Sequence, residues 1–184
     1  MRVIGGTAKG TRLLVPKGAD VRPTSDAMRE TLFQMLCDMV PGARVLDLFA
    51  GSGAVGIEAL SRGASHCLFV DKSRRCIETI TRNLEACRLR ETAKVRKADV
   101  RRVLHELEED EPYDVAFADP PYGWPGLVRL VEGLVVERRG VSDSGIVIVQ
   151  HRRNVEWPPR LMPSRAKRFG DTMLTFFAPP ELGT

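Results

Sequence analysis

Short apolar runs alternate with segments of helical periodicity through most of the chain. Five of these runs have strand length and are bordered by turn residues: 44–48, 67–70, 93–96, 115–118 and 146–149. The segments between them carry apolar residues three and four positions apart, as helices do that bury one face. Strands that alternate with helices in this way predict a largely parallel α/β sheet with helices on both faces.

The end of the chain departs from this rhythm. Residues 166–169 and 172–177 have strand length, and Gly170-Asp171 between them suits a tight turn. We therefore predict an antiparallel hairpin that closes the otherwise parallel sheet. Such a hairpin is the ending expected of methyltransferases that use S-adenosylmethionine (AdoMet), whereas a nicotinamide-binding Rossmann domain more usually continues with strand and helix units.

The start of the chain is punctuated by glycine and proline. Short apolar pieces at 3–4 and 13–15 predict a hairpin-like β extension. Thr24 or Ser25 is then expected to cap a helix that Pro41-Gly42 ends. These features divide the chain into a basic N-terminal extension over residues 1–24 and one α/β domain over residues 25–184.

The composition is that of an ordinary globular protein. The chain has 184 residues, enough for one well-buried domain, with 43% hydrophobic and 28% charged residues. No apolar stretch approaches the ~18 residues of a membrane span, and the first residues are not expected to form a secretory signal. The cysteines form no Cys-x-x-Cys pair: Cys37, Cys67, Cys76 and Cys87. We expect reduced thiols in a cytoplasmic protein, with neither a metal nor disulfides.

Positive charge gathers near both ends of the chain, and the formal net charge is +4. Before Pro23 only Asp20 opposes five basic residues: Arg2, Lys9, Arg12, Lys17 and Arg22. A second basic cluster lies near the other end: Arg152, Arg153, Arg160, Arg165, Lys167 and Arg168. An acidic run over 106–111 lies between them and is expected at the back of the molecule. The clusters predict surfaces that face nucleic acid, although scattered solvated charge is the alternative for each.

Asp119-Pro120-Pro121-Tyr122 directly follows the fourth predicted strand. Prolines fix their own φ angles and donate no backbone hydrogen bonds, which leaves carbonyl oxygens available as acceptors. A carboxylate beside a free carbonyl suits an –NH2 group, and an adjacent tyrosine suits a flat ring that stacks. These four residues are therefore candidates for catalysis at the exocyclic amine of a nucleobase, with a plain proline turn as the alternative.

A glycine-rich loop joins the strand at 44–48 to the next helix. Gly51, Gly53 and Gly56 satisfy the G-x-G-x-x-G pattern, which nicotinamide enzymes share. Asp47, four residues before the first of these glycines, would repel a diphosphate. It would tolerate a ligand with an ammonium and a sulfonium, which favours AdoMet.

Two more acids end predicted strands, on the side where α/β sheets bind ligands. Asp71 can accept hydrogen bonds from both ribose hydroxyls, and Asp99 can accept one from an adenine amine, although each acid could instead cap a helix. The candidate cofactor-binding residues are Asp47, Phe49, Ala50, Gly51, Ser52, Gly53, Asp71, Lys72, Asp99 and Val100.

Several segments together resemble the 16S ribosomal RNA guanine(966)-N2 methyltransferase family. They cover residues 2–6, 9–12, 22–24, 29–33, 49–56, 58–64, 119–122 and 169–172. The resemblance implies a Rossmann-like class I methyltransferase fold with a mostly parallel seven-stranded sheet. It also implies a monomeric enzyme that uses AdoMet to methylate a guanine amine in the small ribosomal subunit or its assembly intermediate. Two positions depart from the family pattern: Asp71 replaces a common glutamate, and Gln150-His151 stands where an acid is usual. We expect His151 to be an exposed loop residue.

The resemblance and the residue chemistry together suggest roles. Asp119 and Pro120 would accept hydrogen bonds from the amine, while Tyr122 would stack on the extruded base. RNA phosphates would contact four basic residues of the extension: Arg2, Lys9, Arg12 and Arg22.

Other functions stay open at this point. An adenine-N6 methyltransferase of DNA or RNA could use the same four residues, although DNA enzymes usually need a larger recognition domain. A cytosine-C5 enzyme would need a cysteine near Asp119, and the sequence places none there. A nicotinamide dehydrogenase would bind NAD rather than AdoMet, and a non-catalytic RNA-binding assembly factor would not need residues 119–122.

Overall fold

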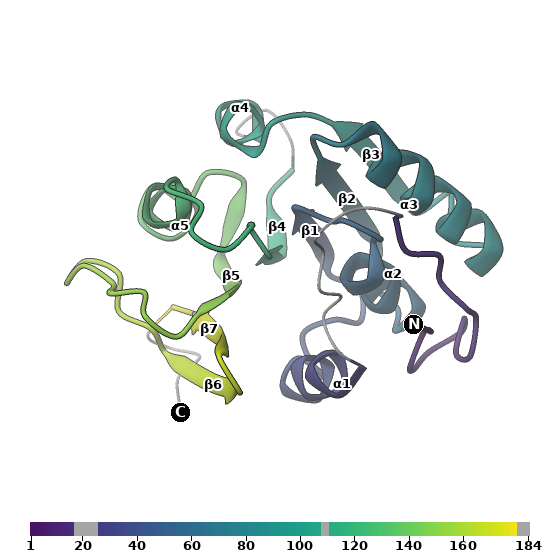
Figure 1. Cartoon of the computed structure of the whole chain (residues 1–184), viewed down its shortest axis with the longest axis horizontal. Coiled ribbons are helices and arrows are strands. Elements are labelled where there is room, and N and C mark those ends of the chain that lie inside the picture. Colours follow the sequence, from purple (N-terminus) through teal and green to yellow (C-terminus); the bar gives the residue numbers. More distant parts are fainter. Residues whose placement is uncertain (17–25, 108–110, 180–184) are drawn as a thin grey trace.

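The structure is a computed structural model that describes residues 1–16, 26–107 and 111–179. Its centre is a seven-stranded sheet with the order β3-β2-β1-β4-β5-β7-β6 (Figure 1). Strands β1 to β5 are parallel, and β7 runs antiparallel to β5 and β6. The strands are β1 (Arg44–Leu48), β2 (His66–Asp71), β3 (Ala93–Lys97), β4 (Tyr113–Ala118), β5 (Val141–Arg152), β6 (Arg165–Phe169) and β7 (Thr172–Phe177). The predicted fold class, a mostly parallel sheet closed by an antiparallel hairpin, is confirmed.

The helices precede or connect the strands, as the periodicity predicts. They are α1 (Asp26–Met35), α2 (Ala54–Ser61), α3 (Arg74–Cys87), α4 (Val100–Glu106) and α5 (Leu127–Val135). Helix α1 ends at Met35, and turns rather than helix continue to the predicted end at Pro41-Gly42. The cap predicted at Thr24 or Ser25 lies outside the described residues, as do Lys17, Arg22 and residues 108–110 of the acidic run.

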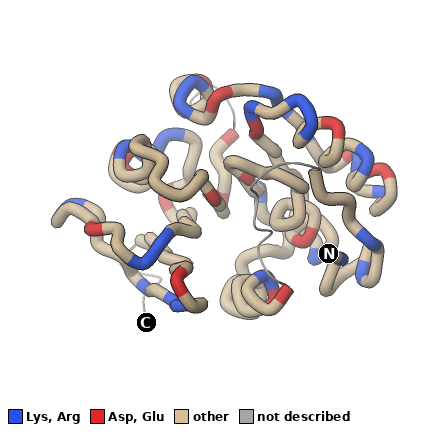
Figure 2. Tube along the Cα trace, in the orientation of Figure 1, with Lys and Arg blue, Asp and Glu red and all other residues tan. Residues whose placement is uncertain are grey.

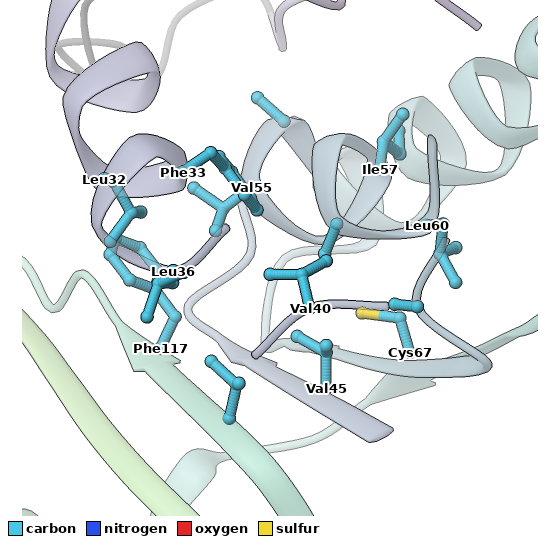
Figure 3. Packing of buried hydrophobic residues seen from close by; sticks show 14 of the residues in the cluster. Leu32, Phe33, Leu36, Val40, Val45, Val55, Ile57, Leu60, Cys67 and Phe117 are labelled. Carbon is cyan, nitrogen blue, oxygen red and sulfur yellow. The ribbon is translucent and has the colours of Figure 1, made fainter. Parts of the chain in front are cut away.

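Alternate residues of the central strands point to opposite faces of the sheet. Val45 and Phe117 pack in one buried cluster with residues of α1, α2 and α3. Leu46 and Ala116 pack in a second cluster with residues of α4 and α5. Figure 3 shows part of the first cluster, where the labelled side chains of α1 and α2 gather above the sheet. Because helices cover both faces, the ends of the strands are the part of the sheet left for a ligand.

Strand β5 is longer than the predicted run and includes Gln150 and His151. The expectation that His151 is an exposed loop residue is wrong, because only 4% of it is exposed. Strand β7 pairs with β5 as far as Arg152, which extends β5 beyond its apolar core. The His151 ring lies 2.6 Å from two oxygens, with Nδ1 next to the Arg152 carbonyl and Nε2 next to Thr175 Oγ1. The long strand thus places residues 150–152 beside β7.

The N-terminal segment folds back on itself as predicted, though with a single isolated bridge between Arg2 and Arg12 rather than two strands. The amides of Val3 and Leu13 donate to the carbonyls of Thr11 and Met1 at 3.0 and 3.1 Å. Turns occupy residues 5–10 and leave little length for a ladder. We call residues 1–13 the N-terminal hairpin.

The described helices include none that is long and apolar enough to span a membrane. The cysteines carry free thiols; Cys37 is exposed, whereas Cys67, Cys76 and Cys87 are buried.

Candidate active site

A cavity of about 350 Å³ opens at the carboxyl ends of the parallel strands. The loops after β1, β2, β3 and β4 all contribute to its wall, since parallel strands bring these loops to one edge of the sheet. The predicted residues that line it are Phe49, Gly51, Asp71, Lys72, Asp99, Val100, Asp119, Pro120, Pro121 and Tyr122. The structure therefore places the glycine loop, both strand-end acids and the Asp-Pro-Pro-Tyr segment around one space.

The glycine loop turns sharply after β1. Phe49, Gly51 and Gly53 have φ angles of 60°, 56° and 77°, the left-handed region that favours glycine. Further along, a Cβ atom at Gly56 would lie 2.4 Å from the Phe69 ring, so the glycine lets α2 approach β2 closely. The loop thereby sets the backbone of Gly51 at the cavity wall.

Asp47 lies beneath this loop rather than at the cavity wall. It is 2% exposed, and its Oδ2 accepts a hydrogen bond from the Gly56 amide at 2.9 Å. Burial raises the pKa of Asp47 to about 8, and the charges of Asp119 and Asp71 act in the same direction. Three other predicted cofactor residues, Ala50, Ser52 and Gly53, also belong to the loop without lining the cavity. In its observed position Asp47 ties the start of α2 to β1.

Asp71 and Asp99 present carboxylates to the cavity from neighbouring strand ends. The Asp71 oxygens accept from the amides of Gly51 and Ser73 at 2.9 and 2.8 Å, which fixes the side chain. Asp99 caps α4 through the Arg101 amide at 2.9 Å and also accepts from the Arg101 guanidinium at 3.0 and 2.8 Å. These bonds to Arg101 lower the pKa of Asp99 to about 2. A carboxylate has about four acceptor positions, so each acid still has at least one position for a ligand.

The Asp119 carboxyl group follows β4 and lies at the wall of the same cavity. Burial raises its pKa to about 7. Within the described residues, neither this carboxyl group nor the Pro120 carbonyl accepts a hydrogen bond that would occupy it. The segment holds its shape through the backbone, because the Asp119 amide donates to the Leu48 carbonyl and the Trp124 amide to the Pro121 carbonyl. Two acceptors are thus left for a ligand with N–H groups.

Tyr122 is 43% exposed and is held by two contacts. Its hydroxyl lies 2.9 Å from Thr172 Oγ1. The guanidinium carbon of Arg152 lies 4.7 Å from the centroid of its ring. Both partners come from the β5–β7 pair, where Arg152 and Thr172 are opposite each other.

Sequence reasoning missed six residues of the cavity wall: Ser73, Cys76, Ala98, Arg101, Trp124 and Gln150. Trp124 makes an edge contact with Phe49, with ring centroids 5.1 Å apart. An aromatic residue two positions after Tyr122 was a signal that could have found it. Gln150 is 4% exposed and reaches the wall because β5 continues past its apolar run.

The predicted RNA contacts of the N-terminal hairpin are exposed where the structure describes them. Arg2, Lys9 and Arg12 lie on its surface, and Figure 2 shows basic positions along this segment near the N-terminus. Arg22 lies outside the described residues.

Comparison with known proteins shows to which family this chain belongs. The family described as conserved hypothetical protein 95 matches residues 1–178. A putative rRNA methyltransferase of Bacillus subtilis is 39% identical over 96% of this chain and 98% of its own length. The ribosomal RNA small subunit methyltransferase D of Escherichia coli is 33% identical over 82% of this chain and 74% of its own length.

Solved structures agree with this assignment. A hypothetical protein of Thermus thermophilus superposes with a TM-score of 0.85 at 32% identity and covers 97% of this chain and 99% of its own. A putative methyltransferase of Escherichia coli gives a TM-score of 0.82 at 30% identity, with 97% of each chain covered. The resemblance drawn from the sequence motifs is therefore confirmed, and this chain belongs to the conserved hypothetical protein 95 family, whose curated relatives include ribosomal RNA small subunit methyltransferase D.

Proposed function

We propose that this protein transfers a methyl group from AdoMet to the exocyclic N2 amine of a guanine, at the 966-type position, in 16S rRNA of the small ribosomal subunit. One observation carries the proposal: the free acceptors of Asp119 and Pro120 share a cavity with the glycine loop and with Asp71 and Asp99. The names of the relatives support an rRNA substrate.

The residues of the cavity fit AdoMet. The volume of about 350 Å³ lies within the ~300–1,000 Å³ of small-molecule sites. Asp71, which two amides hold in place, would accept hydrogen bonds from the ribose hydroxyls. Asp99 would accept a hydrogen bond from the adenine amine, beside the wall residues Ala98 and Val100. Carboxylates at the wall suit a ligand that carries an ammonium and a sulfonium. When bound, AdoMet would supply an electrophilic methyl group; the amine of the base would attack its carbon in line with the C–S bond, which breaks and releases S-adenosylhomocysteine.

The Asp119 segment would make the amine reactive. Guanine N2 is a weak nucleophile because its lone pair is delocalised into the ring. The Asp119 carboxylate and the Pro120 carbonyl would each accept one N–H, which orients the lone pair away from them. Tyr122 would stack on the extruded base, a contact worth ~1–3 kcal/mol. These residues supply positioning and electrostatic stabilisation, and the proton leaves after attack.

RNA would be held by phosphate contacts of Arg2, Lys9 and Arg12 on the N-terminal hairpin. Arg22, later in the sequence, would make a fourth phosphate contact. The enzyme would act as a cytoplasmic monomer on the small subunit or its assembly intermediate.

The test is tritiated methyl transfer to small subunits that lack this modification, followed by nucleoside mass spectrometry. The expected product is N2-methylguanosine, and N6-methyladenosine would overturn the proposal. Asp119→Ala and Tyr122→Ala are expected to keep AdoMet affinity, measured by calorimetry, and to lose transfer. Full activity of both variants would sink the mechanism.

A further inference from the structure

A second, smaller cavity of about 210 Å³ lies on the other side of the Asp-Pro-Pro-Tyr segment. Pro120, Pro121, Tyr122 and Trp124 line both cavities and therefore form the partition between them. The wall of the smaller cavity is otherwise mostly apolar, with Val128 and Val155 among its residues, and Arg152 is the cation in it. Unlike the larger cavity, its described wall contains no acid.

Tyr122 divides the two cavities, and Arg152 covers it from one side. Arg152 lines the smaller cavity and not the larger one, so its guanidinium meets the ring from the smaller cavity. Thr172 fixes the tyrosine hydroxyl, which keeps the ring in the partition. A guanidinium stacked on an aromatic ring keeps the N–H groups at its edge free, and these match the geometry of a phosphate.

Positive charge continues outward from Arg152. Residues 152–171 include six basic residues and two acidic ones. Arg153, Arg165 and Lys167 are exposed and make no ion pair within the described residues, and β6 is exposed over most of its length. Figure 2 shows basic positions in this part of the chain. This surface adjoins the smaller cavity through Arg152 and is complementary to the charge of a polynucleotide backbone.

We propose that the smaller cavity binds the base of a nucleotide that flanks the target guanine, and that Arg152 holds the phosphate between the two. The inference rests on the proposed function, because a target base stacked on Tyr122 from the larger cavity has its neighbour one phosphate away, across the partition. The cavity is smaller than the ~300–1,000 Å³ that drug-sized ligands need, and an apolar slot of this size suits a single heterocycle. The smaller cavity would thus contact a second base of the RNA. The enzyme would then recognise the nucleotide next to the target guanine as well as the guanine itself.

Two fluorescein-labelled oligoribonucleotides test this without AdoMet. One strand contains a guanine between ordinary nucleotides, and the other has abasic sites on both sides of that guanine. Binding of each is measured by anisotropy to the wild-type chain, to Val155→Trp, which fills the smaller cavity, and to Arg152→Gln. Val136→Trp is the control, because Val136 is 51% exposed at the end of α5 and lines neither cavity.

The wild type and Val136→Trp are expected to bind the intact strand at least about fivefold more tightly than the abasic strand. This factor is the lower end of the affinity that one stacked base contributes. Val155→Trp is expected to lose this preference, and Arg152→Gln, which alters an exposed side chain, to bind the intact strand more weakly. Equal binding of both strands by the wild type, an undiminished preference in Val155→Trp, or binding of the intact strand by Arg152→Gln as tight as that of the wild type would overturn the inference. Because no methyl transfer is measured, a failure of the proposed function shows separately in the transfer assay.

Discussion

At the scale of single residues, the Asp119 carboxyl group is the most informative. It lies at the cavity wall, accepts no hydrogen bond within the described residues, and has a pKa of about 7 because it is buried. Only the ionised form offers acceptors on both oxygens. At neutral pH the group is therefore divided between a form that can receive the amine and one that is less able to do so.

We expect kcat/KM for methyl transfer to rise between about pH 6 and about pH 8 with an apparent pKa near that of Asp119. The rate rises with pH because Asp119 has a raised pKa: its carboxyl group stays protonated up to about pH 7, and the ionised acceptor form predominates above that pH. Asp119→Asn keeps one acceptor oxygen and does not titrate. It should therefore be slower and lack this limb of the profile. A limb that remains in Asp119→Asn would assign the titration to another group.

The sequence predicted the residues that directly follow strands. Asp71 ends β2, Asp99 comes two residues after β3 and Asp119 directly follows β4, and parallel strands bring such ends together at one cavity. Gln150 and His151 could not be placed, because pairing with a strand later in the chain, β7, rather than local pattern, extends β5 through them. Arg101, in the first turn of α4, and Trp124 could not be placed either, because their positions depend on how the chain turns after β3 and β4.

At the scale of elements, the contact of α2 with β2 depends on one glycine. A Cβ atom at Gly56 would lie 2.4 Å from the Phe69 ring and 2.6 Å from the Cys67 sulfur, and all three residues are buried. Helix α2 also directly follows the glycine loop. Its distance from the sheet therefore affects both stability and the site.

Gly56→Ala is expected to lower the free energy of unfolding by about 1–3 kcal/mol, the usual effect of overpacking a core. Gly133→Ala is the matched control, because its Cβ would meet the nearest atom at 3.6 Å, within helix α5. Alanine favours a helix over glycine by ~1 kcal/mol, so the control should be at least as stable as the wild type. Urea unfolding measures both, and equal stability of all three proteins would contradict the expectation.

Buried polar groups of α1 and α2 fasten the N-terminal hairpin. Glu58 is 1% exposed and accepts from the amides of Ile4 and Gly5, each at 2.8 Å. Arg29 is fully buried and donates to the Arg2 carbonyl at 2.6 Å. Helical periodicity predicted α1 and α2 from their apolar positions, and it says nothing of where these two charged residues point. These two face inward because they satisfy the backbone of the hairpin.

Glu58→Gln is expected to loosen the N-terminal hairpin, because a charged acceptor of two amides becomes a neutral one. RNA affinity should fall and cleavage of the first residues by trypsin should become faster, while AdoMet affinity stays within about twofold. Glu85→Gln, an exposed change on α3, serves as the control. If Glu58→Gln binds RNA as the wild type does, the attachment of the hairpin has no part in RNA binding.

At the scale of the whole molecule, the sheet gathers acidic side chains at the carboxyl ends of its parallel strands. Asp47 lies near the end of β1, Asp71 ends β2 and Asp119 follows β4, which are neighbouring strands. Burial is the main cause of the raised pKa of both Asp47 and Asp119. A cation in the cavity favours the ionised carboxylates and lowers both pKa values, so its binding releases protons. The formal net charge of the whole chain is +4, and the positive charge elsewhere on it does not cancel this local field.

AdoMet is therefore expected to bind more tightly at about pH 8 than at about pH 6, since less proton release is needed where the acids are already ionised. S-adenosylhomocysteine lacks the sulfonium charge and should show a smaller change. Calorimetry in buffers of different ionisation enthalpy measures both the affinity and the protons released. Identical pH dependence for the two ligands would refute the coupling.

Strand β6 has a further consequence as the last strand of the sheet. Among the described residues it pairs with β7 on one side only, so the amides and carbonyls on the other side of its backbone are available to a strand of another molecule. Arg165, Lys167 and Arg168 crowd this edge with like charges, which opposes the addition of a second copy. Neutralising them to probe RNA binding would also remove this protection against aggregation. Loss of activity in such variants therefore has to be separated from self-association, which light scattering detects.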